Sequence, residues 1–159
     1  MKKTSILFLC TGNSARSIMA EAIANHHFGG KLAAQSAGAQ PKDQPHPLTL
    51  ATLSAHGIST AGLRSKDVKT LVDQPFDLVI TVCDAARQAC PVFPKARRTV
   101  HWNLPDPPAA ANPKDMFEAV FEILEEAIGL IANGPDPDPV QSAVEAGRQI
   151  SRRFSPRAV

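Results

Sequence analysis

The amino-acid sequence predicts an α/β domain built on a four-stranded parallel sheet flanked by helices. Segments rich in branched apolar residues alternate along the chain with segments of helical periodicity, and glycine or proline marks most of the boundaries between them. The 159 residues suffice for one domain with a complete core. Strands that alternate with helices favour a parallel sheet covered on both faces. We expect the flavodoxin-like strand order 2-1-3-4, in which the first and third strands are neighbours.

The first half of the chain contains two predicted strands, each followed by a predicted helix. A buried strand is expected over residues 5–9, and a helix over 14–28, where apolar residues recur at helical spacing before a Gly-Gly stop. A second strand over 31–38 enters a glycine turn. A helix follows over 46–57, with Pro47 in its first turn and a glycine at its end.

The second half begins with a weak helical segment over 65–72 and then returns to strands. Residues 76–83 carry the strongest strand pattern of the chain, and 97–104 form the predicted fourth strand. Residues 113–134 form a long amphipathic helix. The sequence GPDPDP then interrupts the pattern, so we expect a main domain over 1–134 and a C-terminal extension over 135–159, either helical or disordered.

Composition excludes several classes of protein. The net charge of +2 is too small to indicate a nucleic-acid partner, and no apolar run approaches the roughly 20 residues of a membrane helix. The apolar run after Lys2 and Lys3 is shorter than a signal-peptide core, so we expect a cytoplasmic protein, and we expect a monomer. Three cysteines are too few for a disulfide scaffold, and the paired CxxC motifs of zinc sites are absent, so no metal is expected.

The segment CTGNSARS, residues 10–17, joins the first strand to the first helix and is the strongest candidate site. In parallel α/β sheets, ligands bind beyond the carboxyl ends of the strands, where Cys10 lies. Gly12 and Asn13 tolerate the backbone angles of a sharp turn, and successive N–H groups in such a turn can form an anion nest beside a helix N-terminus. The oxyanion is expected to bind residues Thr11, Gly12, Asn13, Ser14, Ala15 and Arg16.

Two side chains of this segment would make Cys10 reactive. Arg16 can close the cradle with a planar guanidinium suited to a tetrahedral oxyanion, and Ser17 can donate a hydrogen bond to the sulfur. Both favour the thiolate, which is the nucleophilic form of cysteine. The alternative is a buried strand-end thiol with an unrelated surface arginine six residues later. The flanking strand, glycine turn and helix favour the nucleophile.

CTGNSARS resembles the phosphate-binding loop of the low-molecular-weight protein tyrosine phosphatases and of the arsenate reductases that share their fold. SAGAQP after the second strand, GISTAGLRSKDV and NLPDPP resemble the same family, and together the resemblance spans roughly residues 4 to 132. It implies a low-molecular-weight phosphatase-like fold. It also implies that Asp106, in a proline-stiffened loop after the fourth predicted strand, is the general acid that protonates the departing oxygen.

The other two cysteines favour the reductase over the phosphatase. Cys83 would end a strand adjacent to that of Cys10, within reach of a disulfide or close to it. If residues 83–90 are helical, Cys83 and Cys90 lie roughly 10 Å apart, so joining them requires that segment to unwind. The resemblance to thioredoxin-coupled arsenate reductases implies a relay: Cys10 attacks arsenate, Cys83 resolves the adduct, Cys90 resolves the Cys10–Cys83 disulfide, and thioredoxin reduces Cys83–Cys90. The alternative is two structural cysteines.

Other interpretations stay open at this point. A tyrosine phosphatase would use Cys10 through a phosphocysteine, with Cys83 as protection against oxidation, although the chain has no tyrosine to line an aryl site and only Trp102 or Phe93 could supply a wall. A non-catalytic oxyanion or redox sensor would need neither the nucleophile nor the acid. Phosphate or sulfate would compete with arsenate, and glutathione with glutaredoxin or another small thiol could replace thioredoxin as the electron donor.

One departure from the family concerns potassium, which some thioredoxin-coupled members bind near the loop. Asn13, Glu21 and Ser36 match three of the expected ligands, but Lys66 stands where an aspartate is expected after Ser65. A fixed ammonium could take the place of the cation, so we predict no potassium dependence and no bound cofactor.

Overall fold

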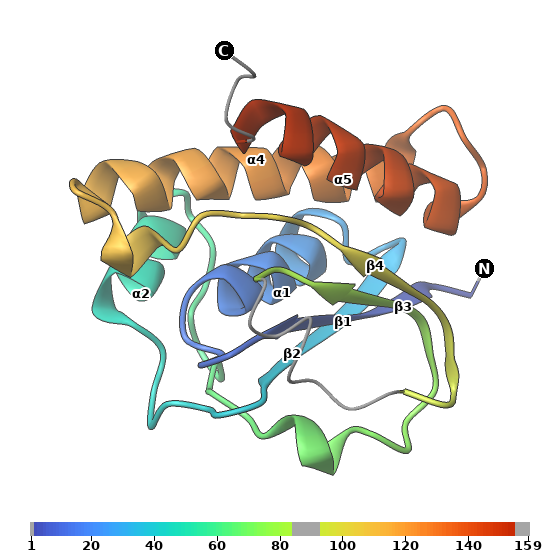
Figure 1. Cartoon of the computed structure of the whole chain (residues 1–159), viewed down its shortest axis with the longest axis horizontal. Coiled ribbons are helices and arrows are strands. Elements are labelled where there is room, and N and C mark those ends of the chain that lie inside the picture. The colour runs from blue at the N-terminus through green and yellow to red at the C-terminus, as the bar shows by residue number, and fades with distance from the viewer. Residues whose placement is uncertain (1, 84–92, 155–159) are drawn as a thin grey trace.

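The computed structural model describes residues 2–83 and 93–154, which form a four-stranded parallel sheet with helices packed against it (Figure 1). The strands are β1 (Thr4–Cys10), β2 (Leu32–Gly38), β3 (Phe76–Thr81) and β4 (Ala96–His101). Their order is β2-β1-β3-β4, and every pairing is parallel. The predicted class and the predicted 2-1-3-4 order are both confirmed.

The central strand β1 carries alternate side chains to two separate cores. Ile6 and Phe8 face a large cluster that contains residues of α1 (Arg16–His27), α4 (Pro113–Asn133) and α5 (Pro139–Phe154). Leu7 and Leu9 face a smaller cluster on the opposite side of the sheet, which includes Val68 and Phe93. Because side chains alternate along a strand, the continuous apolar run Ile6–Leu9 of β1 fills both cores.

Proline and polar caps set the helix boundaries much as the sequence predicts. Helix α2 (Pro47–Ala55) begins after His46, whose Nδ1 accepts the Leu48 N–H, and α4 begins after Asn112, whose side chain accepts the Asp115 N–H. Proline fits the first helical position because its missing N–H would have no partner there. In the C-terminal extension, residues 139–154 form helix α5, which packs on α4.

Several predicted elements are shorter in the structure, among them the strand predicted over 76–83, which ends at Thr81. The segment 65–72 forms only one 3-10 turn, η1 (Val68–Thr70), which the Asp67 carboxylate caps by accepting the Lys69 N–H at 2.9 Å. The predicted strand over 97–104 ends at His101, because beyond it the Leu104 N–H turns back to the carbonyl of Trp102.

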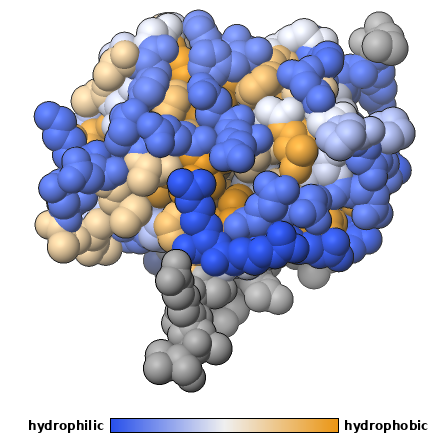
Figure 2. All heavy atoms as spheres, turned by 90° about the horizontal axis from the view of Figure 1, so that it is seen from above, coloured by the Kyte–Doolittle hydropathy of each residue, from blue (hydrophilic) through white to orange (hydrophobic). Residues whose placement is uncertain are grey.

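Figure 2 shows the face formed by α4 and α5, where hydrophilic side chains dominate and apolar side chains appear only in scattered patches. The helices therefore use one apolar face each, directed toward the sheet. In the two ranges that the structure describes, no helix is both long and apolar enough to span a membrane.

Candidate active site

Cys10 is the last residue of β1, and its buried thiol lies in a short hydrogen-bonded chain. The Cys10 Sγ and Ser17 Oγ atoms are 2.8 Å apart. Asn13 Nδ2 donates to the same Ser17 oxygen at 2.8 Å, which leaves the Ser17 hydrogen available for the sulfur.

The carbonyl groups of the loop between β1 and α1 are all bonded on its outer side. The carbonyls of residues 11 to 14 accept hydrogen bonds of 2.7–2.9 Å from outside the loop. The N–H and C=O of a peptide point in opposite directions, so the N–H groups that follow these carbonyls face the interior of the loop. The donors are the backbone N–H groups of Gln40, Lys42 and His46 and the hydroxyl groups of Thr49 and Ser65.

Asn13 and two glycines allow this loop to close tightly. Asn13 has a left-handed backbone with φ of 47°, which asparagine tolerates better than most residues. Gly12 does not adopt a positive φ, contrary to the expectation from its sequence position; instead the Lys42 side chain packs over it, 3.2 Å from where a Cβ would lie. A Cβ on Gly38, at the end of β2, would come within 2.5 Å of the Thr11 carbonyl oxygen.

Arg16 connects this loop to the segment that follows β4. Its Nη1 donates to the Leu104 carbonyl at 3.0 Å, and its Nη2 lies 3.4 Å from the Asp106 carboxylate. Among the described residues, its buried Nε atom has no hydrogen-bond partner. A buried guanidinium donor without a protein partner, next to inward-facing amides, is the arrangement expected for binding an oxyanion. Asp106 is half exposed at the rim of this site.

Cys83 lies beside the same loop. β1 pairs with β3 up to Leu9 and Thr81, and the Val82 N–H donates to the Leu9 carbonyl at 2.8 Å, so Cys83 follows directly on the neighbouring strand. Its sulfur is buried, 3.5 Å from the Thr11 hydroxyl oxygen. The predicted placement of Cys83 at this sheet edge thus has a structural counterpart. Cys90 and the segment 84–89, whose conformation the sequence left open, lie outside the described residues.

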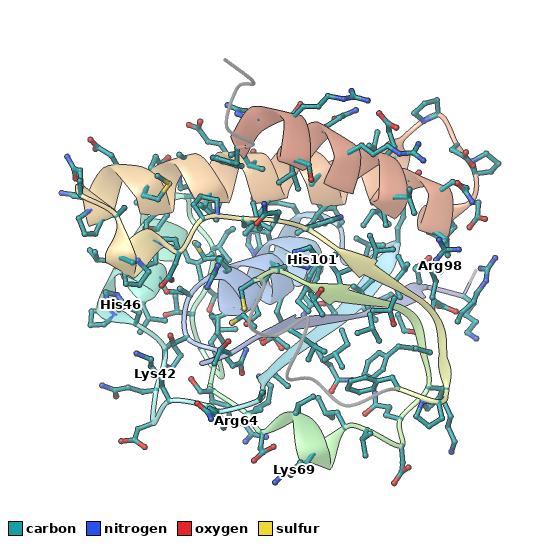
Figure 3. The ribbon with its side chains drawn as sticks, viewed as in Figure 1. Lys42, His46, Arg64, Lys69, Arg98 and His101 are labelled. Atoms are coloured by element: carbon teal, nitrogen blue, oxygen red, sulfur yellow. The ribbon has the colours of Figure 1, made fainter. Side chains whose placement is uncertain are left out.

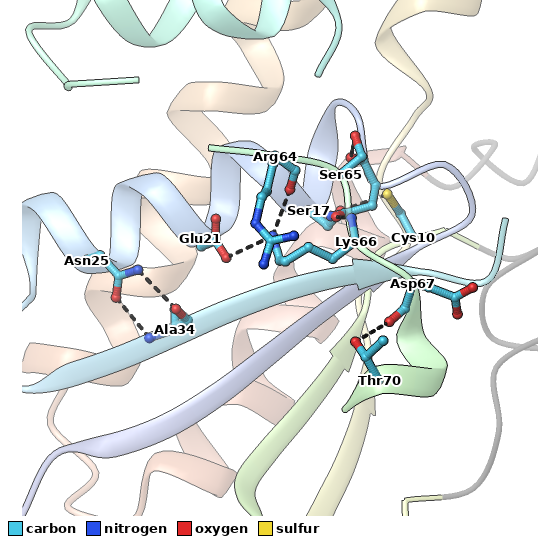
Figure 4. A network of polar contacts seen from close by, with 11 residues as sticks. Cys10, Ser17, Glu21, Asn25, Ala34, Arg64, Ser65, Lys66, Asp67 and Thr70 are labelled. Carbon is cyan, nitrogen blue, oxygen red and sulfur yellow. Dashed lines mark hydrogen bonds and ion pairs between the residues drawn. The ribbon is translucent and has the colours of Figure 1, made fainter. Parts of the chain in front are cut away.

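An ion pair between Lys66 and Glu21 of α1 lies next to the loop (Figure 4). Lys66 Nζ lies 3.5 Å from Glu21 Oε1, and the Lys66 backbone N–H donates to Asn13 Oδ1 at 2.8 Å. Burial raises the pKa of the Glu21 carboxyl above its ordinary value, and the neighbouring Lys66 ammonium limits that rise. The donor set does not fit a potassium ion, because the Glu21 carboxylate already faces an ammonium group and Asn13 Oδ1 already accepts a hydrogen bond.

In the described ranges, no exposed phenylalanine or tryptophan forms an aromatic wall at the rim of the site. None of the seven phenylalanines is exposed, and Trp102 is fully buried. Phe93, the other candidate wall residue, packs on Phe76 in the smaller core. Small residues follow Asp106, and Figure 3 shows Lys42 and Arg64 on the side of the molecule where β1 and the loop meet. This arrangement suits a small inorganic anion better than an aryl phosphate.

The structure also identifies contributors that the sequence did not indicate. The Leu104 carbonyl anchors Arg16 without any side-chain signature, and the outer donors Gln40, Thr49 and Ser65 are far from the loop in sequence. Gln40 and Ser65 fall within the family-like segments SAGAQP and GISTAGLRSKDV, so only that signal pointed to them. In the described ranges, no cluster of three or more His, Cys, Asp or Glu side chains could hold a metal ion.

Comparison with known proteins adds a consistent set of similarities. The family model for low molecular weight phosphotyrosine protein phosphatase matches residues 5–134. An arsenate reductase of Halalkalibacterium halodurans is 34% identical over 129 residues, which are 81% of this chain and 92% of that protein. A solved arsenate reductase in the phosphate binding state superposes with a TM-score of 0.71 at 27% identity, covering 81% of this chain and 96% of that one. A thioredoxin-dependent arsenate reductase of Corynebacterium glutamicum gives a TM-score of 0.60 at 26% identity, over 80% of this chain and 63% of that one.

Proposed function

Because the chain belongs to the low molecular weight phosphotyrosine protein phosphatase family, we propose that it uses the family's loop to reduce arsenate to arsenite. The observation that carries the proposal is the buried Cys83 thiol beside the Cys10 loop, 3.5 Å from Thr11. A phosphatase resolves its thiol intermediate with water. A reductase needs a second thiol at this place, and relatives with that name align over most of the chain.

The first step places arsenate in the loop, held by the inward N–H groups and by Arg16. The Cys10 thiolate attacks arsenic and forms a sulfur–arsenic bond, while Asp106 protonates the departing oxygen, which leaves as water. Asp106 is suited to this role because its carboxylate lies at the rim, 3.4 Å from the guanidinium that would bind the same oxyanion. Arsenic stays pentavalent in the adduct.

Reduction occurs when a second thiolate attacks the Cys10 sulfur. Cys83 forms a disulfide with Cys10, and the electron pair of the sulfur–arsenic bond passes to arsenic, which leaves as trivalent arsenite. Cys90 then attacks Cys83 and releases the Cys10 thiolate, and a dithiol donor reduces the Cys83–Cys90 disulfide. We propose thioredoxin as that donor, because a thioredoxin-dependent relative shares the fold. The net reaction consumes two thiols and releases one water for each arsenate.

The decisive assay follows NADPH oxidation by the purified protein with thioredoxin and thioredoxin reductase, with and without arsenate. We expect arsenate-dependent consumption. The Cys90→Ser variant should release one arsenite per protein and then stop with Cys10 linked to Cys83, which mass spectrometry of the unreduced peptides detects. A steady-state rate equal to that of the unmodified chain would contradict the relay. The Cys10→Ser variant is the matched control and should release no arsenite.

The alternative activities give different results in the same experiments. A tyrosine phosphatase would hydrolyse p-nitrophenyl phosphate through Cys10 and would show no arsenate-dependent NADPH consumption with thioredoxin or with glutathione and glutaredoxin. An oxyanion sensor would bind arsenate or phosphate tightly without turnover. The burial of Trp102 and Phe93, the two candidate wall residues, favours the reductase over the phosphatase.

A further inference from the structure

Helix α5 lies outside the family match, which ends at residue 134, yet it is integrated into the core. Its apolar face is buried against α4 and β4, and Figure 1 shows α5 lying along α4 near the end of β4. The buried residues of this face are Val140, Ala143, Ala146 and Ile150. A helix this well packed raises the question of whether it also acts on the site.

The contact between α5 and the sheet is centred on Trp102, the residue after β4. Trp102 is fully buried, and its indole Nε1–H donates to the Ala143 carbonyl of α5 at 2.9 Å. Gly147 lets the helix backbone approach: a Cβ there would lie 3.1 Å from both the His101 carbonyl oxygen and Trp102 Cδ1. A buried indole N–H needs a partner, so the position of α5 determines where this ring lies.

Trp102 begins the segment that reaches the active loop. The Leu104 N–H donates to the Trp102 carbonyl at 3.0 Å, and the Leu104 carbonyl in turn accepts the Arg16 guanidinium at 3.0 Å. Two residues later, Asp106 pairs with the same guanidinium. Only one residue therefore lies between Trp102, which contacts α5, and Leu104, whose carbonyl holds the Arg16 guanidinium.

We propose that α5 is a brace for the active site and that Trp102 is the positioning residue through which it acts. The helix fixes the segment 102–106, which sets the orientation of Arg16 and of Asp106. The proposal goes beyond the reaction and rests on the proposed function only in assigning arsenate as the oxyanion; the brace itself concerns any tetrahedral oxyanion in the loop.

Three variants separate this role from simple stabilisation. Gly147→Ala places a methyl group against Trp102, and Trp102→Phe keeps an aromatic ring but removes the indole N–H. Ile150→Ala is the matched control, because Ile150 is a buried residue of the same helix that lines a pocket shared with Ile123 and Ala127 of α4. The intact chain is used throughout. Trp102 is the only tryptophan in the sequence, so fluorescence of the Gly147→Ala and Ile150→Ala proteins reports directly on the contact.

The readouts are the melting temperature, the dissociation constant for inorganic phosphate by calorimetry, and the rate of arsenite release in the first turnover. We expect Gly147→Ala and Trp102→Phe to weaken phosphate binding roughly tenfold and to slow the first turnover by at least as much, because displacements of about 1 Å have effects of this size. Gly147→Ala should also shift the tryptophan emission. Ile150→Ala should lower the melting temperature and leave the dissociation constant within twofold.

Two outcomes would overturn the brace. One is unchanged phosphate affinity in Gly147→Ala together with a shifted emission. The other is an equal loss of affinity in Ile150→Ala. A chain that binds phosphate with the predicted ranking of variants but does not reduce arsenate would contradict the proposed function and support the brace.

Discussion

Replacing Lys66 by methionine removes the ammonium group that faces the buried Glu21 carboxylate and keeps a side chain of similar length. The two side chains are 17% and 10% exposed, and the charged atoms lie 3.5 Å apart. Removing one partner of a buried ion pair costs about 3–5 kcal/mol of stability, since it leaves the other charge without compensation. Both side chains retain some contact with water, so we expect a loss of about 3 kcal/mol at pH 8.

The loss should depend on pH in a direction that the Glu21 carboxyl determines. Burial raises the pKa of Glu21 in the folded protein, so this residue favours the native state at low pH and that contribution is lost as pH rises through the folded pKa. Without Lys66, which lowers that pKa, the carboxyl would titrate at still higher pH. The stability difference between the variant and the original chain should therefore be small near pH 5 and grow toward pH 8.

Urea denaturation at several pH values measures this difference. Lys69→Met serves as the control, because Lys69 is exposed three residues away, and it should change stability by less than about 0.5 kcal/mol. The double variant Glu21→Gln, Lys66→Met should recover most of the loss, because no unpaired charge remains. A loss in Lys66→Met that is the same at pH 5 and pH 8 would refute the reasoning.

Two further predictions concern the same loop. Exchanging sodium for potassium at constant ionic strength should change the KM for arsenate by less than twofold, since the Lys66 ammonium already faces Glu21; a several-fold gain in affinity with potassium would count against this. Gly38→Ala should lower the melting temperature and weaken phosphate binding at least tenfold, because its methyl group would meet the Thr11 carbonyl at 2.5 Å. The control Gly30→Ala, which has nothing within 4 Å of the added methyl group, should leave phosphate binding unchanged. Similar phosphate affinity in both variants would show that the close approach at Gly38 is unimportant.

Most of the fold could be predicted because its signals are local. Periodicity identified α1 and α4, Pro47 and Gly57 marked the ends of α2, and short apolar or branched segments indicated the four strands, most strongly β3. Errors occurred where distant contacts decide: the segment 65–72 forms only the 3-10 turn η1, and β4 ends at His101 because the Leu104 N–H beyond it turns back to the Trp102 carbonyl. The sequence also left open whether the C-terminal extension was helical, since its apolar residues are few and only packing on α4 gives them a core.

The site divides in the same way. Cys10, Arg16 and Ser17 lie in one short segment, residues 10–17, so their spacing alone indicated a nucleophile in an anion-binding loop. The carbonyl of Leu104 has no sequence signature, and the donors at Gln40 and Ser65 have ordinary side chains whose importance comes only from their position. At Gly12 the expected left-handed backbone is absent, and the feature that the structure shows there is the close approach of the Lys42 side chain.

The sequence separation of the groups around the loop bears on how the protein matures. The Ser65 hydroxyl bonds a carbonyl 52 residues earlier in the chain, and the Leu104 carbonyl holds an arginine 88 residues earlier. Contacts between distant residues form late, because long loops must close first. During synthesis, the N-terminal cysteine therefore emerges long before its anion cradle can close. An incomplete chain that lacks Leu104 therefore cannot hold Arg16 in the position that it has in the folded protein.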